Sequence, residues 1–188
     1  MRKLKLQVQI SIDGFIAGPN SEMEWMTWNW DEALKSYVGA LTEPIDTILL
    51  GRVLAQGFID HWAGLATNPD TSDAISRKFH ETPKVVFTHT LHEHSWAHTT
   101  LAHGDLVEEV TALKQQPGGD MIVYGGGKFV TSLIQHGLID QFFLFVNPTA
   151  IGQGMPIFQG LEQKLNLKLV EAKAFECGIA VVRYDYEL

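Results

Sequence analysis

The sequence has a single cysteine and no long hydrophobic segment. Because Cys177 has no second cysteine to pair with, an internal disulfide is excluded and a reducing compartment is favoured. No apolar run approaches the roughly 18 residues that a membrane-spanning helix needs. The first residues alternate between polar and apolar side chains and lack the continuous apolar core of a signal peptide. We therefore expect a cytoplasmic protein that does not associate with membranes.

Positive charge is scarce as well. The chain has 14 lysine and arginine residues against 22 aspartate and glutamate residues, which gives a formal net charge of −8. An excess of negative charge argues against nonspecific binding to nucleic acids. Neither an internal repeat nor a linker-like tract divides the 188 residues, and this length suffices for one sizeable core. The sequence therefore predicts one domain that covers residues 1–188.

A strand, a glycine turn and a helix follow one another near residue 125. Residues 121–124 form a short apolar run that is typical of a buried strand, Gly125, Gly126 and Gly127 follow, and residues 129–136 have helical spacing. Such a turn points backbone N–H groups and the positive end of a helix dipole at one place, which suits a phosphate group. A tight turn without any ligand would use the same residues. The dinucleotide motif G-x-G-x-x-G is absent here.

A second unit of the same kind contains an arginine. Residues 47–50 form an apolar run, Gly51 and Arg52 follow, and residues 53–62 are predicted to be helical. The guanidinium of Arg52 suits bidentate binding of a phosphate, although it would also serve to end a helix or to pair with a carboxylate. Both turns should lie at the carboxyl edge of a parallel sheet, where open α/β sheets bind ligands.

Hydrophobic periodicity elsewhere predicts an α/β domain. Residues 4–12 alternate strictly, which predicts a strand with one apolar face. Further strands are predicted at 84–88, 141–146, 165–174 and 179–186, and helices at 31–41, 72–80 and 105–115. The last two strands are separated by a short turn at Gly178 and should form an antiparallel hairpin. We expect a three-layer αβα fold around a mainly parallel mixed sheet with this antiparallel C-terminal hairpin, and with residues 48–50, 85–87, 121–123 and 142–146 in central strands.

Clustered aromatic residues allow two interpretations. Trp25, Trp28 and Trp30 follow the first strand and either plug the core or form a surface that a flat ligand or another subunit covers. Together with the apolar run at 142–145, Trp28 and Trp30 offer more hydrophobic surface than one small domain needs to expose. We therefore predict a homodimer.

Histidines are concentrated between residues 89 and 103. Their spacing is compatible with metal ligation, which makes a metal-binding protein one hypothesis for the function. No cysteine and few carboxylates lie nearby, and the glycine and threonine neighbours indicate a solvated loop, so we predict no metal site. The histidines are His89, His92, His94, His98 and His103.

Five short pieces, in this order, span most of the chain and together resemble one superfamily. The chain resembles the dihydrofolate-reductase-like proteins, and most of all the single-domain relatives of the riboflavin-biosynthesis reductase domain. Each piece alone is common, whereas the set and its spacing are specific. The pieces are Ile-Asp-Gly-Phe-Ile-Ala at 12–17, Ile-Leu-Leu-Gly-Arg at 48–52, Val-Tyr-Gly-Gly-Gly at 123–127, Gly-Leu-Ile-Asp at 137–140, and the proline- and glycine-rich segment at 148–158.

The resemblance implies an NADPH site. In this family two glycine turns flank the phosphates of the cofactor, polar residues at a strand end approach the adenosine 2′-phosphate, and a loop covers the nicotinamide. The matching residues are Gly51, Arg52 and Val53 at the first turn, Gly125, Gly126, Gly127 and Lys128 at the second, Thr88, His89 and Thr90 at the strand end, and Ile16 and Ala17 in the loop.

The resemblance also implies a reductase of a small heterocyclic substrate, either pterin-like or similar to a phosphorylated ribosylaminouracil. Dihydrofolate reductases bind the pterin with a carboxylate on the first helix, and Asp31 and Glu24 lie near the matching place. Asp31 also suits the N-cap of the helix at 31–41. A non-catalytic nucleotide-binding or ligand-sensing protein with the same fold is the alternative to an enzyme.

Overall fold

The computed structural model describes residues 1–125 and 127–187. Its strands are β1 (Leu4–Ile10), β2 (Phe15–Ala17), β3 (Ile45–Gly51), β4 (Lys84–Phe87), β5 (Thr99–Ala102), β6 (Asp120–Tyr124), β7 (Gln141–Val146), β8 (Met155–Pro156), β9 (Leu167–Ala174) and β10 (Ala180–Tyr186). Its helices are α1 (Glu32–Thr42), α2 (Arg52–Thr67), α3 (Ala74–Glu81), α4 (Leu106–Gln115) and α5 (Gly127–Gln135). No helix in this described part of the chain is long and apolar enough to span a membrane.

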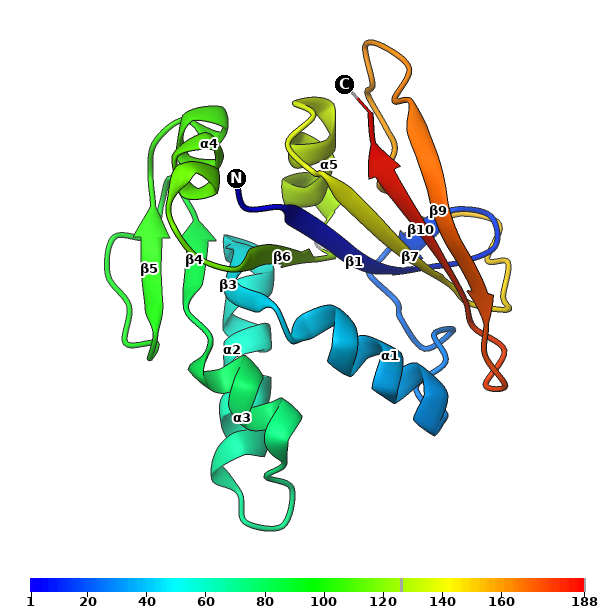
Figure 1. Cartoon of the computed structure of the whole chain (residues 1–188), viewed down its shortest axis with the longest axis horizontal. Coiled ribbons are helices and arrows are strands. Elements are labelled where there is room, and N and C mark those ends of the chain that lie inside the picture. Colours follow the sequence, from blue (N-terminus) through cyan, green and yellow to red (C-terminus); the bar gives the residue numbers. More distant parts are fainter. Residues whose placement is uncertain (126, 188) are drawn as a thin grey trace.

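The main sheet has the strand order β5-β4-β3-β6-β1-β7-β10-β9. The strands from β5 to β7 pair in parallel, and β10 and β9 add an antiparallel edge. Helices α4 and α5 cover one face, and α1, α2 and α3 cover the other (Figure 1). The prediction of a three-layer fold with a C-terminal hairpin is therefore confirmed.

The face that carries α1, α2 and α3 has two separate hydrophobic clusters. The α1 cluster packs α1 against β7, β10 and the turn before β10, and it consists of Leu34, Val38, Leu41, Phe143, Phe145, Phe175, Ile179 and Val181. The α2–α3 cluster packs α2 and α3 against β3, β4 and β6, and it consists of Ile45, Ile48, Leu50, Ala55, Ile59, Phe79, Val86 and Ile122. Strand β1 lies between the strands of the two clusters. Its side chains on this face belong to neither cluster.

Strand β1 differs from its prediction in burial and in length. The alternation predicted one apolar face, and the side chains of that face do enter the core under α4 and α5. The polar face is buried too, since Lys5 and Gln7 are only 7% and 8% exposed. Alternation describes the chemistry of two faces but does not show whether the polar face reaches water. The strand ends at Ile10, and Ile12 is already in the exposed turn.

Ion pairs between buried cations and partly exposed carboxylates lie at the amino ends of the parallel strands. Lys114 Nζ lies 2.6 Å from the carboxylate of Asp140, which precedes β7. Lys5 pairs with Asp120 at 3.0 Å, and Arg2 pairs with Asp46. The Gly-Leu-Ile-Asp piece at 137–140 therefore has a structural role at this amino edge of the sheet.

Three strands lie where we predicted loops. Strand β5 lies inside the histidine-rich segment and pairs in parallel with β4, which corrects our expectation of a solvated loop. Strands β2 and β8 form a two-stranded antiparallel sheet of their own. All three have only two to four residues, too few for a periodic pattern, so only their pairing partners define them. Helix α2 also continues beyond residue 62, to Thr67.

The aromatic residues are more deeply buried than we expected. Residues 142–145 lie in β7 inside the sheet and are buried, so this run does not offer the surface that we assigned to a subunit interface. Trp30 stacks on Phe145 with ring centroids 6.1 Å apart and thus plugs the core. Trp28 is 62% exposed and remains on the surface.

Lys84 gives the fold a pH dependence. Its side chain is 2% exposed, and its Nζ donates to the carbonyl oxygens of His80 (2.6 Å) and Thr82 (2.8 Å). Burial lowers the pKa of Lys84 to about 8. Between this pKa and the unfolded value near 10.5 the unfolded chain binds more protons, so the free energy of unfolding should rise with pH, by at most about 1.4 kcal/mol per pH unit. Urea unfolding of the wild type and Lys84→Met at pH 7.5, 9 and 10 measures this; a wild-type slope no steeper than that of the variant would contradict it.

Candidate functional site

The two glycine turns lie side by side at the carboxyl edge of the sheet. Strands β3 and β6 pair in parallel with Leu49 opposite Val123, so Gly51 and Gly125 leave the sheet together. A Cβ atom on Gly51 would lie 2.7 Å from the Cβ of Phe129, so the close approach of α5 to this turn requires glycine. Our prediction that the turns share an edge is confirmed, while Gly126 lies outside the described residues.

The helix N-termini at these turns differ from the others in charge. Helices α1, α3 and α4 begin with aspartate N-caps, at Asp31, Asp73 and Asp105, whose carboxylates accept backbone N–H groups. Helix α2 has no side-chain cap and begins with Arg52, and α5 has Lys128 and no acidic residue in its first turn. A cationic side chain at a helix N-terminus is repelled by the positive end of the helix dipole. An anionic ligand there would be attracted both by the dipole and by the cationic side chain.

The predicted phosphate-binding side chains at this edge are free. Arg52 and Lys128 are exposed, and neither the guanidinium nor the ammonium group has a hydrogen bond or an ion pair within the described residues. Val53 is 88% exposed. The fold does not use these side chains, so they remain available to a ligand.

A pocket of about 240 Å³ opens beside the triple-glycine turn. Three of the predicted site residues, Thr88, His89 and Lys128, meet in its wall. Two aromatic rings face each other there, since the centroids of Phe87 and Phe129 are 5.0 Å apart. The lining combines apolar rings with polar and cationic groups, which suits a planar base that carries a phosphate. The full lining is Phe87, Thr88, His89, Ala102, Gly104, Leu106, Lys128, Phe129 and Ser132.

Thr88 shapes the loop after β4. It is buried, and its hydroxyl oxygen accepts the N–H groups of Thr90 (3.2 Å) and Leu91 (3.0 Å). Its carbonyl oxygen lies 2.9 Å from Nδ1 of His103 at the end of β5. Through these bonds Thr88 turns the chain and leaves His89 and Thr90 exposed, and His89 lines the pocket.

The Ile16–Ala17 segment and the glycine-rich loop form one unit. Ile16 and Ala17 are buried in β2, which pairs with β8. The carboxylate of Asp13 accepts the N–H groups of Gly152 (2.7 Å) and Ile151 (3.1 Å). The hydroxyl of Ser11 and these amides hold the pKa of Asp13 below its usual value. The segments at 12–17 and 148–158, which are the first and last of the five sequence pieces, are thus hydrogen-bonded to each other. Met155 of the second segment lies next to Gly127 in the triple-glycine turn.

Gly154 fixes this unit, and alanine there should be destabilising. A Cβ atom would lie 2.2 Å from the backbone oxygen of Ala17, so β8 and β2 would have to separate. We expect Gly154→Ala to lower the free energy of unfolding by about 1–3 kcal/mol. Gly57→Ala is the control, because nothing lies within 4 Å of a Cβ at this exposed helical position and alanine should stabilise it by about 0.5–1 kcal/mol. Urea unfolding measures both, and effects of the same sign would refute the explanation.

The two candidate catalytic carboxylates occupy different positions. Asp31 is the N-cap of α1, as expected, and both its oxygens are engaged: Oδ1 accepts the N–H of Leu34 (2.8 Å) and Oδ2 that of Cys177 (2.9 Å). The N–H of Leu34, and then that of Cys177, lower the pKa of Asp31, so its carboxylate is held charged. Glu24 is exposed in the tryptophan-containing loop. The geometry gives Asp31 a structural role and brings neither carboxylate to the glycine turns.

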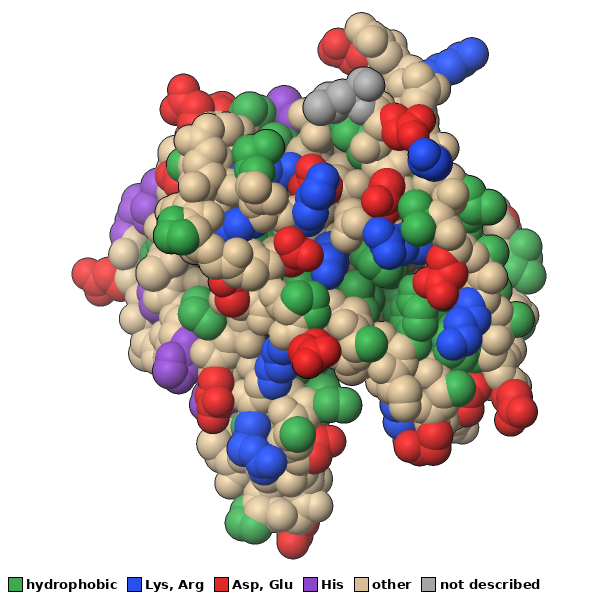
Figure 2. All heavy atoms as spheres, in the orientation of Figure 1, with side chains coloured by type: hydrophobic (Ala, Val, Ile, Leu, Met, Phe, Trp, Pro, Cys, Tyr) green, Lys and Arg blue, Asp and Glu red, His purple; other side chains and the backbone are tan. Residues whose placement is uncertain are grey.

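The histidines lie mainly at the outer edge beside β5 (Figure 2). They form pairs instead of a convergent set: the rings of His92 and His103 stack at 5.5 Å, and those of His80 and His98 meet edge to face at 6.0 Å. Within residues 1–125 and 127–187 no group of three or more histidine, cysteine or acidic side chains is placed to hold a metal ion.

Sequence reasoning missed two residues, Gln7 and Tyr124. The Oε1 atom of Gln7 and the hydroxyl of Tyr124 are buried and have no hydrogen-bond partner among residues 1–125 and 127–187. Burial raises the pKa of the Tyr124 hydroxyl well above its ordinary value, so the group stays protonated. For Tyr124 the signal in the sequence is a hydroxyl-bearing side chain at the end of an apolar run, whereas Gln7 is one of several polar residues of an alternating strand and carries no signal of its own.

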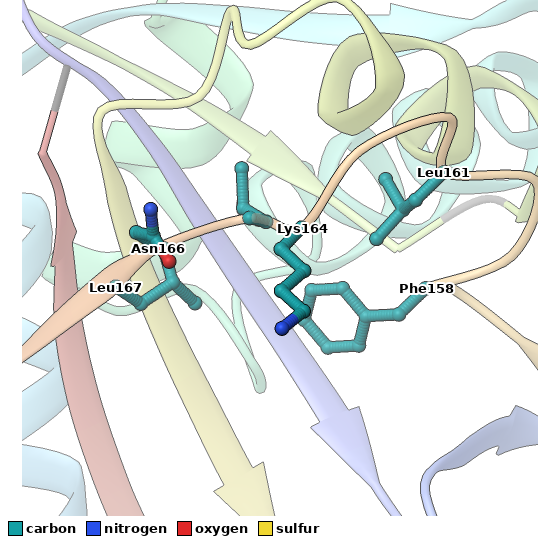
Figure 3. Close-up of a pocket in the computed structure, with 6 residues that line it drawn as sticks. Phe158, Leu161, Lys164, Asn166 and Leu167 are labelled. Atoms are coloured by element: carbon teal, nitrogen blue, oxygen red, sulfur yellow. The ribbon is translucent and has the colours of Figure 1, made fainter.

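A second pocket, of about 430 Å³, lies beside the beginning of β9, away from the glycine turns. The loop between β8 and β9 forms it, with side chains of Phe158, Leu161 and Lys164 along one wall (Figure 3). Leu167, which also lines it, is opposite Tyr186 at the end of β10. None of the predicted site residues reaches this pocket, so the candidate site is the carboxyl edge.

Comparisons with known proteins agree with this fold. The chain is 32% identical over 188 residues to the uncharacterized protein YyaP of Bacillus subtilis, with 98% of this chain and 95% of that protein covered. A crystal structure of a putative riboflavin biosynthesis protein from Shewanella sp. PV-4 superposes with a TM-score of 0.74 at 20% identity over all of both chains. Dihydrofolate reductase from Enterococcus faecalis, complexed with NADP(H), gives 0.61 at 16% identity, covering 99% of this chain and 97% of that one.

A family model extends this agreement over nearly the whole sequence. The model of the RibD C-terminal domain matches residues 2–181, which include both glycine turns, the β2–β8 unit and the buried ion pairs. The solved structures share less than 25% of their residues with this chain and therefore support the fold alone. On the match to the family model, this chain belongs to the RibD C-terminal domain family.

Proposed function

We propose that the protein is an NADPH-dependent reductase of a small heterocyclic substrate, working in the cytoplasm. The observation that carries this proposal is the pair of helix N-termini at the carboxyl edge, where α2 begins with Arg52 and α5 has Lys128 in its first turn, with no acidic residue in either first turn. Every other described helix N-cap is an aspartate. An arrangement that repels cations and leaves N–H groups open is suited to a pyrophosphate.

The residues at this edge fit the separate parts of NADPH. The pocket that Phe87 and Phe129 help to line would hold the adenosine half, with Thr88, His89 and Lys128 near its 2′-phosphate. The glycine turns would hold the pyrophosphate. When bound, the cofactor supplies the hydride, and the protein orients the nicotinamide and excludes water.

The β2–β8 unit would cover the reacting end. Ile16 and Ala17 would pack their apolar side chains against that end of the site. The Asp13 carboxylate holds the glycine-rich loop in place by accepting the N–H group of Gly152. In the proposal this unit shields the hydride from water. It also leaves the substrate to approach from the face of the sheet that carries α1 and α2.

Named relatives support an oxidoreductase without fixing its substrate. One similar structure, which this chain matches over 57% of that protein's length at a TM-score of 0.69 and 19% identity, is a Thermotoga maritima diaminohydroxyphosphoribosylaminopyrimidine deaminase and 5-amino-6-(5-phosphoribosylamino)uracil reductase. The dihydrofolate reductase in the comparison reduces dihydrofolate, as its name states. Both substrates are planar nitrogen heterocycles.

Fluorescence titration with NADPH and NADH tests the cofactor, and consumption of NADPH with dihydrofolate or a ribosylaminouracil phosphate tests the reaction. We expect NADPH to bind more tightly than NADH. Binding without turnover of any heterocycle would favour a non-catalytic nucleotide-binding or ligand-sensing protein. Absence of NADPH binding would refute the reductase.

We further propose that the protein acts as a homodimer. Trp28 is a large aromatic side chain that is exposed in the loop leading into α1. Light scattering at micromolar concentration should show twice the chain mass. A species of 21.0 kDa alone would contradict the dimer.

A further inference from the structure

The face of the main sheet that carries α4 and α5 loses its cover toward the outer edge. Side chains directly opposite one another on paired strands point to the same face, so Phe142, Tyr184 and Leu169 form one row from β7 through β10 to β9. Phe142 is 1% exposed, Tyr184 is half-buried, and Leu169 is 55% exposed. The layer that covers the centre of the sheet therefore ends before β9.

Strand β9 is apolar on this face and charged on the other. In the rows beyond Leu169, the side chains of β9 on this face belong to Ala172 and Ala174, and both are exposed. The charged side chains point toward α1, where the carboxylate of Glu171 accepts from the hydroxyl of Tyr37 at 2.8 Å. An antiparallel strand with one face in water normally carries polar side chains on that face. The edge strand departs from this pattern.

The pocket beside the beginning of β9 continues the same apolar surface. Phe158 in its wall is 39% exposed, and the ring centroid of Phe158 lies 6.1 Å from that of Phe142. Leu167, the first residue of β9, also lines the pocket (Figure 3). Contiguous apolar surface of this kind marks interaction sites on soluble proteins. The surface is called the β9 face here and consists of Phe158, Leu167, Leu169, Ala172, Ala174 and Val182.

A partner is not expected to extend the sheet beyond β9. Arg183 lies opposite Glu171 and Tyr184 lies opposite Leu169, so Val170 between them has no residue opposite it on β10. Such a bulge bends an edge strand, and the exposed ammonium group of Lys168 adds a charge beside it. Bulges and lysines are the features that keep edge strands from pairing with further strands. A partner would therefore pack on the face of the strand and not along its edge.

The charge of the chain indicates what that partner is. The whole chain has a formal net charge of −8, whereas the six residues of the β9 face have no charge. Two copies would repel each other over most of their surface, and an uncharged patch lets them meet without bringing like charges together. Homodimer interfaces are also more apolar than those of transient complexes. Glu162 and Lys164 stand in the loop before β9, so each copy would offer both signs of charge across a twofold axis.

We infer that the β9 face binds the β9 face of a second copy, with the two sheets packed face to face across a twofold axis. This inference rests on the homodimer proposed above and names its interface. The contact would bury Leu169 and close the pocket beside Phe158 between the two copies. It differs from a dimer through the tryptophan-containing loop, where Trp28 is a single exposed side chain.

Sedimentation velocity over a range of micromolar concentrations tests the interface on the full chain. The variants are Leu169→Glu and Ala172→Glu in the β9 face, and Trp28→Glu in the tryptophan-containing loop. Val107→Glu is the matched control, because Val107 is an apolar side chain on α4 that is 36% exposed and lies outside the β9 face. Near-ultraviolet circular dichroism and titration with NADPH show whether each variant is folded.

We expect the wild type to sediment with twice the chain mass of 21.0 kDa. Leu169→Glu should raise the dissociation constant of the dimer at least about a hundredfold, because the interface would have to bury an unpaired carboxylate from each copy. Ala172→Glu should act in the same direction, and Val107→Glu and Trp28→Glu should have no effect. The melting temperature should rise with protein concentration in the wild type but not in Leu169→Glu.

The outcomes separate this interface from the other proposals. A dissociation constant unchanged in both β9 variants would overturn the β9 interface, and dissociation by Trp28→Glu alone would place the dimer contact in the tryptophan-containing loop. A wild type that stays at 21.0 kDa would refute the homodimer together with its interface. If Leu169→Glu loses its near-ultraviolet signal, Ala172→Glu decides. Binding of NADPH is measured independently, so its absence would refute the reductase and leave the interface intact.

Discussion

Arg52→Ala is expected to weaken NADPH binding by about ten- to a hundredfold, because a charge-assisted hydrogen bond contributes about 1.5–3 kcal/mol. The loss should be larger for NADPH than for NADH, since Arg52 would face the 2′-phosphate side of the cofactor. It should shrink as salt rises, because the exposed guanidinium is screened. Fluorescence titrations with both cofactors at two salt concentrations measure these differences.

The structure sharpens the contrast with a structural arginine. Arg52 has no partner in the described chain and stands against the dipole of α2, so its removal should leave the melting temperature unchanged or slightly raised. Arg77→Ala is a charge-matched control, because Arg77 is an exposed residue of α3 that binds the hydroxyl of Ser72. Equal NADPH affinities in wild type and both variants, or a lower melting temperature in Arg52→Ala alone, would remove the principal support for the cofactor site.

Among the variants proposed for this protein, Asp140→Ala should lower the free energy of unfolding most, by about 3 kcal/mol. One oxygen of Asp140 accepts both from Lys114 Nζ (2.6 Å) and from the N–H of Leu4 (2.7 Å). Without the carboxylate, a largely buried ammonium group and a backbone donor at the start of β1 lose their partner. For a chain of this length the melting temperature should fall by about 6–12 °C, which calorimetry measures.

Two further variants test the cause of that loss. Lys114→Met combined with Asp140→Ala should recover part of the stability, because the unpaired charge is then gone. Glu187→Ala breaks the exposed pair with Lys168 (3.4 Å) and should change the free energy of unfolding by less than about 1 kcal/mol. If Asp140→Ala and Glu187→Ala change the free energy of unfolding by similar amounts, the pair of Asp140 with Lys114 stabilises the fold no more than an exposed pair does.

Local signals allowed much of this fold to be predicted. Gly51 and Gly125 stand where a strand passes into a helix, and apolar runs of strand length precede both, so the two units could be identified from neighbouring residues alone. Asp31 was identified as an N-cap because helix capping also depends on a few adjacent residues. The family resemblance then ordered these units along the chain.

Features that depend on pairing between distant segments could not be predicted. Strand β5 has the sequence Thr-Thr-Leu-Ala and exists because β4 offers an edge to it. The burial of residues 142–145 follows from the place of β7 between β1 and β10, which no local pattern specifies. The burial of Gln7 could not be predicted for the same reason, because alternation predicted an apolar face of β1 but not what covers the polar one.

The position of β1 has a consequence for how the protein is made. The first strand of the chain is a central strand, and both its partners come late: Leu4 pairs with Met121, and Lys5 pairs with Gln141. During synthesis β1 must wait for more than a hundred further residues before it has a neighbour, and contacts of such long range make folding slow. Chains halted before β6 would expose the apolar side of β1 and should be substrates for chaperones and proteases, whereas loss of the outer strand β5 would leave the sheet centre complete.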